Sequence, residues 1–370
     1  MAPRKRKRAR VDSISEQSPP TSPLIFRIPG QTPDTLLSVL GQDYHVHSMV
    51  LKLHSNYFRR FLDSPDKSGE RASQDFRYHY VTVIDDDEFG WSLESIEKAT
   101  SAAPAEISRY YRREEESSAF HHLICAMYNR KYTILDFSAL KLLTETADFF
   151  CALPIVSATI IEAVMTGPMT RMRMEEEWSS RSEFSRRACE ISKIAPKLRN
   201  PILFRDAIIE VVSRWDHHQE SVSDIGTKAS DFFDRSTLRL IEREYARVSK
   251  LLARCSHLLL LRILDGRLWE IGEMVPAPED ESAWRSADFY HRIRLRIIEK
   301  LEGIHYRFIR PETREALDKL RQSIDELLQN NLVLDQSHCG PGELGMHEHA
   351  FLCAEISDDD LPWDTSEIDW

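Results

Sequence analysis

The order of hydrophobic and polar residues divides the chain into a sheet-forming segment and a long helical segment. Residues 35–40 are apolar and strand-prone, residues 41–43 (Gly-Gln-Asp) predict a turn, and residues 44–46 predict a short return strand. From His47 the apolar residues recur at helical spacing. A third strand is predicted over residues 76–84, where side chains alternate between two faces. A β-hairpin is therefore expected to lead into a helical hairpin.

After the third strand, apolar residues recur every three or four positions, which predicts helices through most of the remaining chain. Pro168 predicts the end of one helical group, and Pro201 suits the first turn of a later helix. Over residues 238–252 a core-facing helix is favoured over a coiled coil, because two heptads are too few to prefer the latter. The predicted stripes are Phe120, Leu123, Ile124, Met127 and Tyr128; Leu140, Leu143, Ala147 and Phe150; Phe204, Ile208, Val211 and Trp215; Leu238, Ile241, Tyr245, Val248 and Leu252; Phe289, Ile293, Ile297 and Leu301; Leu317, Leu320, Ile324 and Leu327.

The segment HSMVLKLHSNYFRRFL combines a histidine, an apolar pair and a Ser-x-Tyr-Phe sequence before a hydrophobic end. Ser55 in it is expected to cap the second helix. This order of parts, continued to about residue 165, resembles the BTB/POZ domain, with fungal BTB proteins the nearest in character. The residues that carry the resemblance in this segment are His47, Val50, Leu51, Ser55, Tyr57 and Phe58.

The resemblance implies an α+β fold, in which a small mixed sheet is flanked by helical hairpins. It also implies protein partners and self-association as a two-fold homodimer, with a monomeric domain that binds one partner as the alternative. The residues expected in or beneath that interface are Leu36, Val50, Leu51, Tyr57 and Phe58.

Two departures from the family pattern limit what the resemblance implies. Repressor-type BTB domains pair an acidic residue at the first strand with a basic residue directly after the histidine. Asp34 fits the first position, but Ser48 occupies the second. Residues 88–117 are expected to form an insertion in the region where cullin-binding relatives carry their motif. These departures argue against a corepressor pocket and leave no cullin motif to assign.

Breaks in composition predict four parts. Residues 1–23 read as a disordered basic and Ser-Pro-rich tail, and residues 24–167 as the BTB-like domain. Residues 171–334 are expected to form an all-α domain, and residues 335–370 an irregular acidic tail.

The bulk composition narrows the function classes. A formal net charge of −11 argues against nonspecific binding of nucleic acid by the whole chain, because such binding neutralises phosphates with Lys and Arg. The 6 cysteines contain no Cys-x-x-Cys pair and fit reduced thiols in an intracellular protein. No apolar stretch follows the basic N-terminus, and the longest apolar run is broken by Pro154 and Glu162, so neither a secretory signal nor a membrane span is expected.

The basic run near the N-terminus predicts nuclear import, with a solvated basic tail or a contact with nucleic-acid phosphates as alternatives. A nuclear location is therefore expected, and a cytoplasmic one is the alternative. The residues of the run are Lys5, Arg6, Lys7 and Arg8.

The C-terminal tail offers four candidate zinc ligands, Cys339, His347, His349 and Cys353. Zinc takes four such ligands tetrahedrally, but their spacing is not that of a standard zinc finger, and a loop with reduced thiols is favoured over a metal site. The GPGELG sequence within this segment lacks room for the βαβ unit of a dinucleotide site. The acidic end with Trp363 and Trp370 predicts either a linear docking segment or a solubilising tail.

No sequence motif of an active site was found, so the chain is expected to be non-enzymatic and to need no cofactor. Two function classes remain. The first is a substrate adaptor for a cullin-type ubiquitin ligase, in which the BTB surface takes the scaffold. The second is a nuclear transcription or chromatin regulator with the possible tail zinc.

Overall fold

The computed structural model describes most of the chain after residue 21. The residues that it leaves undescribed beyond that point are 63, 65–72, 74, 86–89, 97–111, 168–180, 216–231, 265–282, 304–308, 336–338, 346 and 368–369. The described part forms two compact units. The first comprises Met1–Lys52 and Arg60–Ser117, and the second comprises Leu53–Arg59 and Ser118–Trp370. The second unit thus includes residues 118–167, which were expected in the BTB-like domain, together with a short segment before residue 60.

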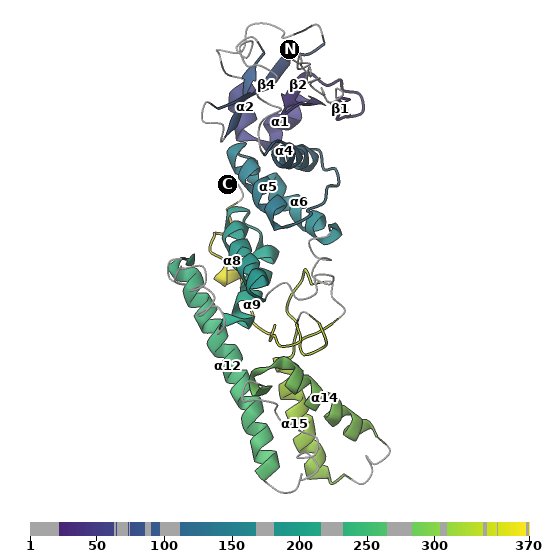
Figure 1. The fold of residues 1–370 in the computed structure, drawn as a ribbon, viewed down its shortest axis with the longest axis vertical. Coiled ribbons are helices and arrows are strands. Elements are labelled where there is room, and N and C mark those ends of the chain that lie inside the picture. The colour runs from purple at the N-terminus through teal and green to yellow at the C-terminus, as the bar shows by residue number, and fades with distance from the viewer. Residues whose placement is uncertain are drawn as a thin grey trace, which may run out of the picture. The chain divides into compact units, whose positions relative to one another are not determined.

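The first unit contains a five-stranded mixed sheet with the order β1-β3-β2-β4-β5 (Figure 1). Strands β2 and β3 form an antiparallel hairpin, and β2 pairs in parallel with β4. Strand β1 adds to one edge in parallel with β3, and β5 adds to the other edge antiparallel to β4. The strands are β1 (Leu24–Ile25), β2 (Thr35–Val39), β3 (Gln42–Val46), β4 (Tyr78–Ile84) and β5 (Trp91–Ser95).

The hairpin turn lies earlier than the sequence predicted. Leu40 has φ 49° and Gly41 has φ 89°, so both central residues of a two-residue turn are left-handed. This is the turn geometry whose twist matches that of the flanking strands. Arg113 Nε donates to the carbonyl of Leu40 at 2.9 Å and holds the turn. Gln42 and Asp43, expected in the turn, therefore begin β3.

Strand β5 was not predicted, because residues 88–117 were interpreted as an insertion. Trp91–Ser95 pairs antiparallel with β4, and Leu93 at its centre is buried while the other four residues are half-buried. The indole nitrogen of Trp91 donates to Glu116 Oε2 at 2.5 Å. Glu116 lies in α4 (Arg113–Met127), so the last strand and the next helix are joined by this bond.

The second unit is helical apart from its C-terminal segment. Helix α9 begins at Pro201, where Asn200 accepts from the N–H of Leu203 at 3.0 Å. Helix α8 packs against α9, α12 against α9 and α15, and α14 against α15 (Figure 1). No described helix is long and apolar enough to cross a membrane. The helices beyond α4 are α5 (Phe137–Phe149), α6 (Leu153–Thr166), α8 (Arg181–Lys197), α9 (Pro201–Ser213), α12 (Arg235–Leu264), α14 (Ala287–Glu302) and α15 (Pro311–Leu327).

The predicted stripes form the helical core. All the stripe residues of α9, α14 and α15 are buried, as are Ile241 and Val248 of α12. Leu238, Tyr245 and Leu252 of α12 are half-buried. Since α12 turns this stripe toward α9 and α15 of the same chain, the structure supports a core-facing helix over a coiled-coil seam.

Candidate interaction surfaces

Helix α1 (Ser48–His54) begins at a residue that binds the carboxylate of Asp34, which lies just before β2. Asp34 Oδ1 accepts from the backbone N–H of Ser48 at 2.7 Å, and Asp34 Oδ2 accepts from the Ser48 hydroxyl at 2.6 Å. The carboxylate thus satisfies one of the N–H groups that a helix start leaves without a helical partner. Asp34 serves to start this helix in place of pairing with a base, which agrees with the expected lack of a corepressor pocket.

The two sides of α1 differ in exposure. Val50 and Leu51 are buried, whereas Met49 is 56% exposed and Leu53 is 66% exposed. Met49 and Leu53 are four residues apart, so their side chains lie on one helix face. This exposed apolar pair is the α1 face. The sequence analysis did not predict it, since Val50 and Leu51 were named from the family resemblance. The four-residue spacing of Met49 and Leu53 is the signal that places them on a shared face.

The five predicted interface residues lie mostly beneath the surface. Val50, Leu51 and Phe58 are buried, and Leu36 and Tyr57 are half-buried. The three buried residues are core residues and cannot contact a partner directly in this structure. These three side chains lie beneath the predicted interface and support it, but they are not part of its contact surface.

Helix α2 (Asn56–Leu62) is held by its cap and by an aromatic cluster. The Ser55 hydroxyl accepts from the N–H of Phe58 at 3.0 Å, which confirms the predicted cap. The same hydroxyl donates to the carbonyl of Phe150 at 2.5 Å. The rings of Phe58 and Phe150 stack at 5.3 Å with planes 9° apart, and the Tyr57 ring meets Phe150 edge-on at 5.1 Å. This cluster ties α2 to the end of α5.

The C-terminal segment lies along the helices of the second unit as an extended peptide. Residues 351–357 have no regular secondary structure, so their main-chain groups need other partners. Side chains supply several of them. Asn331 Nδ2 donates to the carbonyl of Ala354 at 2.9 Å, and Arg205 Nε donates to that of Ile356 at 3.1 Å. The N–H of Glu355 donates to Glu244 Oε2 at 3.1 Å.

Arginines on α9, on α12 and just before α9 bind the acidic side chains of this segment. Arg243 donates to Asp360 at 2.7 Å, and this hydrogen bond holds the pKa of the Asp360 carboxyl well below its usual value. Arg205 pairs with Asp358. We call the set Arg199, Arg205, Arg243 and Arg247, together with Phe204, the arginine surface. Its other ion pairs with the segment join Arg199 to Glu367 at 2.8 Å and Arg247 to Glu355 at 3.2 Å, and Arg243 and Arg247 also pair with Glu244 of α12, at 3.0 Å and 2.9 Å.

Two tryptophans complete the contact. The Trp363 ring meets the Phe204 ring edge-on at 5.7 Å, and the Arg199 guanidinium lies 4.8 Å from the centre of the Trp370 ring. Arginine and tryptophan pair well in this way, because the ring face is electron-rich. The acidic end therefore forms a segment docked on the chain's own helices.

The four predicted zinc ligands are not brought together. His347 Nε2 faces Asp335 Oδ2 at 3.3 Å, while His349 Nδ1 contacts the Ser286 hydroxyl at 2.8 Å. Cys353 is buried, and burial raises the pKa of its thiol to about 11, which disfavours the thiolate that zinc requires. Cys339 is half-exposed. Within the described ranges, no three His, Cys, Asp or Glu side chains are grouped so that they could hold a metal ion. The four candidate ligands therefore do not form a shared metal site among the described residues.

The glycine-rich GPGELG stretch has a packing role. Gly342 has φ 83°, and a Cβ there would lie 2.6 Å from the carbonyl oxygen of Ala287 and 2.5 Å from the Cβ of His291. The stretch is a turn that packs on the start of α14, and none of its described residues is in a strand. The structure thus agrees that this is no dinucleotide fingerprint.

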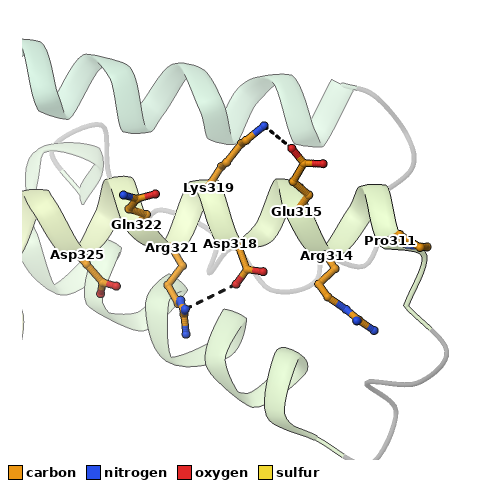
Figure 2. A pocket seen from close by; sticks show the side chains of 8 residues that line it. All are labelled: Pro311, Arg314, Glu315, Asp318, Lys319, Arg321, Gln322 and Asp325. Atoms are coloured by element: carbon orange, nitrogen blue, oxygen red, sulfur yellow. Dashed lines mark hydrogen bonds and ion pairs between the residues drawn. The ribbon is translucent and has the colours of Figure 1, made fainter.

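An open hollow runs along α15 (Figure 2). Its lining charges neutralise one another, since Lys319 pairs with Glu315 at 2.6 Å and Arg321 with Asp318 at 3.6 Å. Figure 2 shows these pairs along the helix, with no side chains converging on a common point. The hollow carries neither the apolar lining nor the convergent polar groups typical of a ligand pocket.

Comparison with known proteins identifies the first part of the chain. No individual characterised protein and no solved structure matches it. The family model of the BTB/POZ domain matches residues 26–87, which contain strands β2, β3 and β4 and helices α1 and α2. This chain therefore carries a BTB/POZ domain at residues 26–87, a fold that implies a protein–protein interaction module.

Proposed function

We propose that this protein is a self-associating adaptor, in which two copies meet through the α1 face and the helical unit presents a partner. The observation that carries the proposal is the α1 face itself, where Met49 and Leu53 are exposed on a helix whose other side is buried. Exposed apolar side chains that lie together are typical of protein interfaces. BTB domains often self-associate, so a second copy of this chain is the proposed occupant.

Replacing Met49 and Leu53 together with Asp is expected to convert a dimer of the full chain into a monomer. Two carboxylates on the α1 face would be desolvated and would face each other across a two-fold interface. Light scattering coupled to size-exclusion chromatography measures the mass directly. The expected result is a fall from the mass of two chains to that of one.

Leu295→Asp is the matched control, because Leu295 is a leucine of α14 that is 49% exposed and lies outside the BTB domain. It should leave the mass unchanged. A wild-type chain that is monomeric at all accessible concentrations contradicts the self-association. If the variant with Met49→Asp and Leu53→Asp stays dimeric, the interface lies on another surface of the chain.

The adaptor role predicts a cullin-type scaffold as one partner. Its support is the combination of a BTB domain with a separate helical unit that offers a second surface. Affinity purification of the full chain from its native cells, followed by mass spectrometry, should recover a cullin. Recovery of transcriptional or chromatin proteins without a cullin would favour the alternative, a nuclear regulator.

Nuclear import through the N-terminal basic run remains part of the proposal. Lys5, Arg6, Lys7 and Arg8 lie outside the described residues, and the support is the sequence alone. Replacing all four with Ala should shift the protein to the cytoplasm, as followed by fluorescence microscopy of a tagged chain. An unchanged nuclear fraction would exclude this signal.

A further inference from the structure

The C-terminal segment has a buried part and a peripheral part. Residues 350–354 are all buried, from Ala350 to Ala354. Beyond them, Leu361 is the only described residue of 357–370 that is buried. We call residues 357–370 the latch. Because little apolar surface holds it, the latch belongs to the part of the molecule that opens most easily.

Ion pairs that reach solvent contribute most of the remaining contact. Asp358 is 79% exposed at its side chain, so water and salt screen its pair with Arg205, whereas in the pair of Arg243 with Asp360 the arginine is 54% exposed and the carboxylate 13%. Such contacts set specificity and speed of association more than they set affinity. The latch is thus specific for the arginine surface and weakly held by it.

The chemistry of the arginine surface fits a peptide better than a nucleic acid. Arg205 binds the Ile356 carbonyl as well as the Asp358 carboxylate, so one side chain of the surface holds a main-chain group just before the latch and an acidic side chain within it. Beside the surface, Glu244 accepts from the N–H of Glu355, which also precedes the latch. Glu244 is a buried carboxylate beside the surface and would repel a phosphate. Phe204 adds an aromatic contact for a tryptophan side chain.

We propose that the arginine surface is a docking site for an acidic, tryptophan-containing linear segment of a partner protein, with the latch as its built-in competitor. A tethered latch acts at an effective concentration of about millimolar, so a free segment binds well only when the latch is open. Partner binding and latch release are then the same event. This proposal rests on the second unit alone and does not depend on self-association through the α1 face.

The test uses the full chain and a fluorescein-labelled peptide with the sequence of residues 357–370. The latch is opened by Asp360→Lys with Trp363→Ala, which removes one ion pair and one ring contact. Fluorescence anisotropy should show at least tenfold tighter peptide binding to the opened variant than to the wild type. Adding Arg205→Ala and Arg243→Ala to the opened variant should abolish that binding.

Arg254→Ala in the opened variant is the matched control, because Arg254 lies on α12 but pairs with Glu326 of α15. It should leave peptide binding unchanged. Should the opened variant fail to fold, Trp363→Ala alone provides the same comparison with a smaller increase.

Three results would overturn the proposal. The first is equal peptide binding by the wild type and the opened variant, which would show that the latch does not compete. The second is tighter binding of a labelled single-stranded oligonucleotide than of the peptide, lost with the two arginine substitutions, which would assign the surface to nucleic acid. The third is a fall in assembly mass on opening the latch, which would assign the surface to a second copy of the chain.

Discussion

Phe58→Ala is expected to lower the free energy of unfolding by about 3–5 kcal/mol, since it removes a fully buried ring and leaves a cavity. The Phe58 ring has no exposed surface and stacks on Phe150. Tyr57→Ala should cost less, because Tyr57 is half-buried, although burial raises the pKa of its hydroxyl to about 12. Chemical denaturation of the full chain, followed by circular dichroism, measures both changes.

Leu135→Ala is the control, because the Leu135 side chain is mostly exposed and lies outside the α1 face. It should change the free energy of unfolding by no more than about 0.5 kcal/mol. A larger loss for Tyr57→Ala than for Phe58→Ala would contradict the packing of this cluster.

Asp206→Ala should lower the free energy of unfolding by about 2–4 kcal/mol, because it leaves backbone N–H groups without their charged acceptor. Asp206 is buried in α9. Its carboxylate accepts from the N–H of Leu334 at 2.7 Å and from that of Val333 at 3.0 Å. It therefore fixes the loop after α15 to α9. Thermal and urea unfolding of the full chain measure the loss.

Asp206→Asn retains one carbonyl oxygen and should cost less than the alanine substitution. Asp318→Ala, which removes a surface ion pair with Arg321 on α15, should change stability by no more than about 0.5 kcal/mol. If Asp206→Ala were as mild as Asp318→Ala, the loop would be held by other contacts.

Local patterns predicted the parts of the fold that depend on neighbouring residues. The stripe of Phe289, Ile293 and Ile297 identified α14, and the burial of all three confirms its core face. Ser55 could be recognised as a cap because a cap acts on a residue only three positions away. The turn was misplaced by a residue or two, since Leu40 adopts a left-handed conformation that its side chain does not favour.

The features that the sequence did not predict involve pairs of distant residues. Strand β5 forms by pairing with the edge of β4. A pattern of five residues is too short to identify a strand by itself or to say which strand it pairs with. The helical period places Val50 and Met49 on different faces of α1, but it does not show which of the two faces is buried. The sheet beside α1 decides that.

The C-terminal segment shows the same limit most clearly. Its sequence determined that it is acidic, aromatic and not helical, and it suggested that Cys353 and His347 share a metal. Only the tertiary structure decided that Arg205 meets Asp358, 153 residues away, and that Cys353 is buried beside the helices while His347 faces Asp335. Charge and helical period are properties of one segment and can be read along it, whereas a docking contact is a property of two segments and exists only when the fold places both.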